Sequence, residues 1–172
     1  SISANVGSMY NQGLELNIGA RILDTRGFQW NASLNLSTLK NRVTRLSDGN
    51  DIYVASNFGI QNLTREGYSV GSAFAVPTIG VNPDNGYRIF INSQGDQVQY
   101  NQAGTNRWTY GKDGSPAPAI NNYSDGRIYG PSLPTWYGGF NNTFTYKGFD
   151  LNIGIVFSGG NKMYNGTRSN LS

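Results

Sequence analysis

The chain has 172 residues with 13 Lys and Arg, 10 Asp and Glu, and neither Cys nor His. The absence of Cys excludes a disulfide framework and thiol catalysis, and the absence of His excludes Ser-His-Asp chemistry and most transition-metal sites. A net charge of +3 does not favour nucleic-acid binding. Low charge with 13% aromatic residues and 23 Gly is typical of an all-β chain with many turns.

Membrane helices are not indicated, because no stretch approaches the roughly 18 consecutive apolar residues that one needs. This does not exclude a membrane protein, since a β-barrel presents its lipid contacts as every second residue of a strand. The chain ends abruptly at Ser172. We therefore expect a piece of a longer protein.

The first predicted hairpin lies near the start of the chain. From Tyr10 to Ile22 apolar residues occupy the even positions and polar or small residues occupy the odd ones. Gln12 is a polar exception on the even side. The segment 24–27, Asp-Thr-Arg-Gly, predicts a tight turn. A second alternating strand runs from Phe28 to Thr38.

The second predicted hairpin lies near the end. Trp136, Phe140, Phe144 and Tyr146 share one face of a strand over 135–146, and Lys147-Gly148 forms the turn. A strand over 149–158 then alternates again, with its apolar residues at odd positions. The four runs are longer than the common globular strand of about 5–6 residues and match the about 9–11 of a tilted membrane strand. Their length favours hairpins that span a bilayer.

Between the hairpins, residues 39–134 differ in character. They contain four turn dipeptides, Asp48-Gly49, Asn85-Gly86, Asp113-Gly114 and Asp125-Gly126. Shorter strands are predicted over 68–76, and over 87–92 and 97–100 as a small hairpin. Short turns at one end and a long excursion at the other are typical of outer-membrane barrels. Whether 68–76 and 87–92 cross the membrane or belong to an extracellular loop stays open.

Three blocks of sequence resemble SusC/RagA-type TonB-dependent outer-membrane transporters, near the C-terminal end of the barrel. The first block carries Asn5, Gly7, Asn11, Gly13, Glu15, Phe28, Trp30, Asn35, Asn41 and Val43. The second is the Gly-rich excursion over 65–98. The third carries Pro134, Gly138-Gly139, Asn141, Tyr146-Lys147-Gly148-Phe149-Asp150-Leu151 and Gly159-Gly160. The blocks come in the family's order and cover nearly the whole chain.

The resemblance implies an antiparallel meander that forms part of the wall of a barrel of about 22 strands, with long extracellular loops. Residues 1–172 would be a segment without the N-terminal plug and the final strands. The resemblance further implies an outer-membrane location in a Gram-negative bacterium, a SusD-like lipoprotein as a lid, and the TonB complex acting through the missing N-terminal regions. Glycans or oligopeptides are the expected cargo.

In such a barrel, each strand has a lipid-facing and a lumen-facing side. We expect lipid contact from Leu14, Leu16, Ile18, Leu34, Leu36, Leu151, Ile153 and Ile155. We expect lumen-facing positions at Glu15, Asn17, Arg21, Asn31, Asn35, Asn141, Asp150 and Asn152. Aromatic residues near the strand ends would form an interfacial girdle.

Three loop aromatics, Trp108, Tyr110 and Tyr123, are candidates for contact with a ligand or the lid, although such residues more often pack within their own loop. We expect no catalytic residue, cofactor or metal. Only two Glu are present, Glu15 and Glu66, and nothing in the sequence pairs them for acid–base chemistry.

Two alternative interpretations remain. A soluble β-sandwich that binds carbohydrate would show the same alternation, with one face buried against a second sheet. A complete eight-strand barrel would fit this length. In the soluble sandwich the Leu and Ile rows would be covered, whereas in a barrel wall they would be open. A complete eight-strand barrel would show eight long strands.

Overall fold

The computed structural model describes residues 6–55 and 61–165, and every element assigned within them is a β-strand. Asn5, which contributes to the family resemblance, lies outside the described residues. The strands form three antiparallel four-stranded sheets, so the predicted all-β class is confirmed. The described part of the chain has no helix long and apolar enough to cross a membrane.

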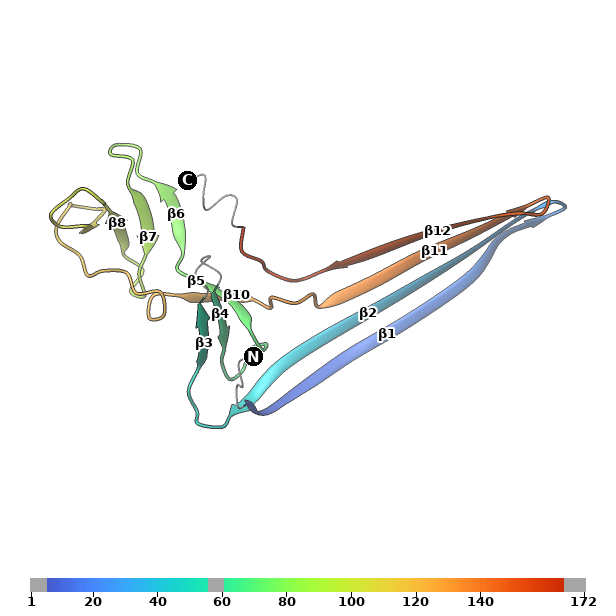
Figure 1. Cartoon of the computed structure of the whole chain (residues 1–172), viewed down its shortest axis with the longest axis horizontal. Helices are drawn as coiled ribbons and strands as arrows, with labels where there is room; N and C mark the ends of the chain where they lie inside the picture. Colours follow the sequence, from blue (N-terminus) through green and yellow to red (C-terminus); the bar gives the residue numbers. More distant parts are fainter. Residues whose placement is uncertain (1–5, 56–60, 166–172) are drawn as a thin grey trace. The chain divides into compact units, whose positions relative to one another are not determined.

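The largest sheet, which we call the long sheet, has the order β1-β2-β11-β12 (Figure 1). Its strands are β1 (Val6–Thr25), β2 (Phe28–Leu46), β11 (Trp136–Tyr146) and β12 (Phe149–Gly159). β2 pairs directly with β11, from Phe28 opposite Tyr146 to Thr38 opposite Trp136. The two predicted hairpins are therefore neighbours, and the long excursion is inserted between adjacent strands.

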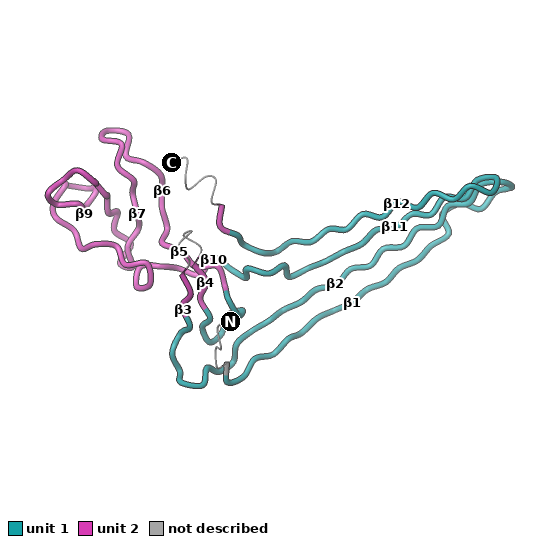
Figure 2. Tube along the Cα trace, in the orientation of Figure 1, with its two compact units in different colours: residues 1–52, 64–71, 130–163 teal, residues 53–63, 72–129, 164–172 magenta. Residues whose placement is uncertain are grey.

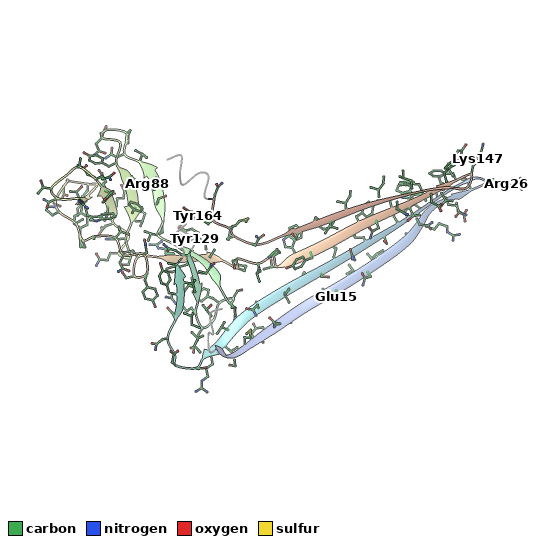
Figure 3. The ribbon with its side chains drawn as sticks, viewed as in Figure 1. Glu15, Arg26, Arg88, Tyr129, Lys147 and Tyr164 are labelled. Atoms are coloured by element: carbon green, nitrogen blue, oxygen red, sulfur yellow. The ribbon has the colours of Figure 1, made fainter. Side chains whose placement is uncertain are left out.

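Both hairpin turns lie at one end of the long sheet. Gly27 has φ +93°, and the Lys147-Gly148 pair has φ of 48° and 85°, a combination that suits a two-residue hairpin turn. The Lys147 N–H donates to the Gly27 carbonyl at 3.2 Å, which links the two turns. Figure 3 shows Arg26 and Lys147 together at this end.

The first hairpin is longer than alternation predicted. β1 and β2 stay paired as far as Val6 opposite Leu46, although polar residues replace the apolar pattern beyond Leu14 and Thr38. Backbone pairing needs no apolar side chain, so the period-2 signal ends before the strands do. A bulge at Ile22 also shifts the register, and Leu23, not Ile22, pairs with Trp30.

The excursion contributes eight strands of three or four residues. One sheet has the order β10-β5-β4-β3, with bounds Arg127–Gly130, Ser72–Ala75, Gln61–Thr64 and Ile52–Ala55. The other has the order β6-β7-β8-β9, with bounds Thr78–Val81, Arg88–Ile91, Gln97–Tyr100 and Trp108–Tyr110.

These short strands resolve the alternatives left open by the sequence. The predicted strand over 68–76 is reduced to Ser72–Ala75, because Gly71 adopts φ +61° and residues 67–70 bond to β2 instead. The hairpin with a turn at 93–96 is confirmed, with Ile91 opposite Gln97. Neither segment enters the long sheet, which therefore has four strands and not eight.

The chain divides into two compact units (Figure 2). Unit 1 comprises residues 1–52, 64–71 and 130–163 and contains the long sheet. Unit 2 comprises residues 53–63, 72–129 and 164–172 and contains most of the excursion. Among the described residues, the buried apolar side chains of unit 1 are Val43 and Leu46, whereas those of unit 2 are Leu63, Phe74, Ile89 and Val98.

Candidate functional site

One face of the long sheet is apolar and lies open. The cross-strand register places Ile18, Leu34, Phe140 and Ile155 in one row across all four strands. Leu14 is 71% exposed, and Leu151 and Ile155 are 56% and 53% exposed. All eight predicted lipid-facing residues lie on this face. A soluble protein rarely leaves such a large apolar patch uncovered, so the face is suited to an apolar medium or a partner.

Aromatic side chains concentrate at both ends of the apolar face. Near the turns, Trp30 stacks on Phe144 with ring centroids 5.5 Å apart, and Phe28 lies 6.4 Å from Tyr146. At the other end, Trp136 lies 6.1 Å from Phe157. This distribution matches the aromatic girdle of a membrane strand.

The apolar face contains one polar side chain that sequence analysis missed. Asn142 is opposite Ala32 on one side and Ile153 on the other, and is 7% exposed. The Trp30 indole N–H donates to its Oδ1 at 3.0 Å, so the amide oxygen is satisfied without water. The even-numbered position of Asn142, between Phe140 and Phe144, is enough to predict that its side chain lies on the apolar face. It does not predict the hydrogen bond with Trp30.

The opposite face of the long sheet is polar. All eight predicted lumen-facing residues lie on it, including Glu15, which Figure 3 labels on β1. Several bond across strands: Thr143 to Asn152 at 2.8 Å, and Thr145 Oγ1 to Asp150 at 2.7 Å. Arg21 pairs with Asp24 at 2.8 Å.

A shallow depression of about 270 Å³ interrupts this polar face. Gly139 forms part of its floor, since a Cβ there would overlap Asn35 Oδ1. The lining residues are Asn35, Ser37, Tyr137, Gly138, Gly139, Asn141 and Val156.

Unit 2 carries a polar pocket of about 300 Å³ between its loops. Its lining is uncharged and rich in amides and tyrosines: Asn82, Asn85, Tyr87, Gln99, Asn101, Asn106, Thr109, Tyr110, Gly111 and Gly114. Gln99 is only 5% exposed, and its Oε1 accepts from Asn85 Nδ2 at 3.0 Å. Amides held in this way suit hydroxyl or amide groups of a neutral ligand.

The three candidate ligand-contact aromatics do not meet at one site. Trp108 packs against Tyr100 and Phe90, with ring centroids 4.7 and 5.7 Å apart. Tyr123 packs against Tyr53 at 5.5 Å. Tyr110 lines the polar pocket, and Lys112 Nζ lies 5.4 Å from its ring centroid.

Asp125 connects two loops of unit 2. Its carboxylate accepts from the backbone N–H groups of Ser93 and Asn121, both at 2.8 Å. Burial raises the pKa of this carboxyl, but the bonds from Asn121 and Ser93 together outweigh burial, so the pKa lies below its ordinary value. The charged form therefore stabilises the loop arrangement.

The acidic side chains of the described residues are dispersed. Among the described residues, no three acidic side chains gather in a way that could hold a metal ion. Asp51, one of the Asp residues of the excursion, pairs with Arg65 at 2.7 Å.

Comparison with known proteins gives a consistent result. No family model matches the chain. The chain is 29% identical over 95% of its length to TonB-dependent receptor P3 of Formosa agariphila, and 30% identical over 94% to receptor P26 of the same organism. It spans only 16% of the length of each. A shorter match, 36% identical over 29% of the chain and 5% of the relative, is to the TonB-dependent receptor SusC of Bacteroides thetaiotaomicron.

Over nearly its whole length the chain is similar to TonB-dependent receptors, and over part of it to SusC. The predicted resemblance to SusC-like TonB-dependent receptors is thus confirmed. These relatives are receptors, and none carries an enzyme's name.

A solved structure supports the fold of the chain. The chain is similar to a chain in the structure of the RagAB peptide transporter, with a TM-score of 0.66 at 22% identity, covering 91% of this chain and 15% of the other. The likeness confirms the antiparallel barrel-wall fold. β1 and β12 are the outer strands of the long sheet, which does not close on itself within the described residues.

Proposed function

We propose that this chain forms part of the barrel wall of an outer-membrane, TonB-dependent nutrient importer. The observation that carries the proposal is the uncovered apolar face of the long sheet, with Leu14, Ile153 and Ile155 between 45% and 71% exposed. The eleven-residue strands β11 and β12 extend about 36 Å at about 3.3 Å per residue, enough to cross a tilted path through the hydrocarbon core.

The polar face would then line the lumen, and the apolar face would meet lipid. The tight turns at 25–28 and 146–149 would face the periplasm, and the excursion between β2 and β11 would form the extracellular mouth, as the usual asymmetry of outer-membrane barrels suggests. The plug and the remaining strands would be supplied by other parts of the receptor.

The proposed partners are a SusD-like lipoprotein lid at the mouth and the TonB complex at the periplasmic side. The proposed cargo is a glycan or an oligopeptide. The uncharged amide and tyrosine lining of the polar pocket supports a cargo contact there, through its neutral hydroxyl or peptide groups. The solved structure that is similar in fold is that of a peptide transporter, and the word peptide describes the cargo of that protein.

A soluble carbohydrate-binding sandwich is a weaker alternative. It requires the Leu and Ile rows to be buried against a second sheet. In the described structure Leu34 and Leu36 are half-buried, and the other six of the eight residues are exposed. The decisive experiment is to fractionate cells that express the full-length receptor and wash the membranes with alkaline carbonate. We expect the receptor to stay in the membrane until detergent is added. Recovery in the soluble fraction without detergent would refute the proposal.

A further inference from the structure

Three basic residues extend the apolar face of the long sheet beyond its last apolar row. Lys40, Arg42 and Arg45 lie on β2, opposite Gln12, Tyr10 and Ser8 of β1. Lys40 and Arg42 follow Leu36 and Thr38 at alternate positions, so their side chains leave the same face. A bulge at Thr44 shifts the register by one residue and brings Arg45 onto that face too. We call these three residues the cationic stripe.

The cationic stripe is exposed and not neutralised. All three side chains are exposed, and none forms an ion pair within the described part of the chain. Three acidic side chains that follow the stripe in the sequence have other contacts. Asp48 Oδ1 accepts from the Asn50 N–H, Asp51 pairs with Arg65, and Glu66 Oε1 accepts from the Leu46 N–H.

The backbone under the cationic stripe is held in place. β1 covers one edge of this part of β2, and residues 67–70 cover the other, with the Val43 N–H donating to the Tyr68 carbonyl at 2.9 Å. Val43 itself is fully buried. The three cations are therefore presented by a rigid strand, along about 17 Å at about 3.3 Å per residue.

The position of the cationic stripe identifies its ligand. Its first residue, Lys40, lies two residues beyond Thr38, which is paired with Trp136. This is the end of the sheet opposite the hairpin turns. If the apolar face meets lipid, as the proposed function requires, the cationic stripe lies at the headgroup level of the leaflet on the loop side. Arginine and lysine bind phosphate oxygens through charge-assisted hydrogen bonds.

We propose that Lys40, Arg42 and Arg45 form a binding site for the phosphate groups of outer-leaflet lipids. Tyr10, opposite Arg42 on β1, adds an amphipathic side chain at the interface. The site would fix the height of the receptor in the membrane and anchor the β1–β2 hairpin below the extracellular loops.

The test uses the full-length receptor in mild detergent and diphosphorylated lipid A as the probe, with bound lipid quantified by native mass spectrometry. The variant is Lys40→Gln/Arg42→Gln/Arg45→Gln. The matched control is Arg26→Gln/Lys147→Gln, which removes two cations at the opposite end of the same sheet (Figure 3). Dephosphorylated lipid A and inorganic phosphate are the comparison ligands.

We expect the triple variant to bind lipid A roughly 100-fold more weakly, because each cation near an anionic lipid surface contributes about fivefold. The control should bind as the wild type does, dephosphorylated lipid should bind weakly to every form, and inorganic phosphate should compete poorly. Unchanged binding by the triple variant, or equal loss in the control, would overturn the site. Full competition by inorganic phosphate would overturn the lipid assignment.

This inference rests on the proposed function, and the two can fail separately. A receptor that fractionates as a soluble protein refutes both. A receptor that resists carbonate extraction, but whose triple variant keeps its lipid affinity, refutes the cationic stripe alone.

Discussion

Large apolar side chains are exposed on the long sheet but buried in the small sheets of unit 2. In unit 2, Leu63 and Val98 are completely buried and Phe74 is 3% exposed, so the apolar side chains form a small core. In the long sheet, Leu14 and Ile155 are more than half exposed, and the polar face is open as well. The difference is the one expected if unit 2 is built for water and, as the proposed function requires, one face of the long sheet is built for lipid.

The strongest effect is expected from truncating the core of unit 2. Phe74 contacts Tyr53 with ring centroids 5.9 Å apart and lies so close to Gly126 that a Cβ there would overlap its ring. Phe74→Ala should destabilise unit 2 by about 3–5 kcal/mol through lost burial and the cavity that remains. Hydrogen exchange of residues 72–75 and 121–126 in the full-length receptor measures this loss.

The matched control for Phe74 is Phe149→Ala in the long sheet. Phe149 is 79% exposed, so its truncation leaves no cavity in the protein. If Phe149→Ala opened unit 2 as much as Phe74→Ala, or if Phe74→Ala changed nothing, the contrast between a water-excluding core and an open face would be wrong.

A charge on the apolar face should have the next largest effect. Leu34 lies near the middle of the apolar rows, opposite Ile18 and Phe140, while its neighbour Ser33 points to the polar face. Leu34→Arg should cost about 2–4 kcal/mol, the penalty for arginine at the bilayer midplane. Urea unfolding of the receptor in lipid vesicles would measure this cost.

Ser33→Arg is the control for this substitution, because it places the same side chain one residue away on the same strand. It should cost much less, since the polar face is hydrated. Equal penalties at positions 33 and 34 would contradict the assignment of one face to lipid and the other to an aqueous lumen.

The smallest of the three effects concerns the loop linkage in unit 2. Asp125→Asn removes the charge that accepts from Ser93 and Asn121, and should weaken the local structure by about 1–3 kcal/mol. Because the pKa of Asp125 is lowered on folding, its contribution is present above the unfolded pKa, near 3.8, and is lost as pH falls through the folded pKa.

Amide exchange of Ser93 and Asn121 at pH 6 and pH 3, corrected for intrinsic rates, checks this linkage. The wild type should lose protection at pH 3, and Asp125→Asn should show low protection at both values. A wild type that keeps the same protection at pH 3 would show that the carboxylate does not stabilise these loops.

Much of the long sheet could be predicted from local pattern. Alternation at 28–38 and 149–158 identified two strands, placed Leu34 and Ile153 on one face, and placed Asn31 and Asn152 on the other. The turn at Lys147-Gly148 followed from residue type, since glycine accepts the positive φ of a hairpin turn. Local pattern also missed the end of the first hairpin, because pairing continues where the side chains become polar.

The sequence by itself thus determined the fold class and the two faces of each long strand, since side-chain alternation and turn chemistry act over a few residues, and three motif blocks carried the resemblance to the SusC/RagA-type transporters. The tertiary structure decided that β2 pairs with β11 across the excursion, that Asn142 meets Trp30, and that Trp108 packs on Tyr100. It also brought the loop amides together in the polar pocket and placed the cationic stripe beyond the apolar rows. These arrangements depend on register between segments far apart in the chain, and no local period encodes that register.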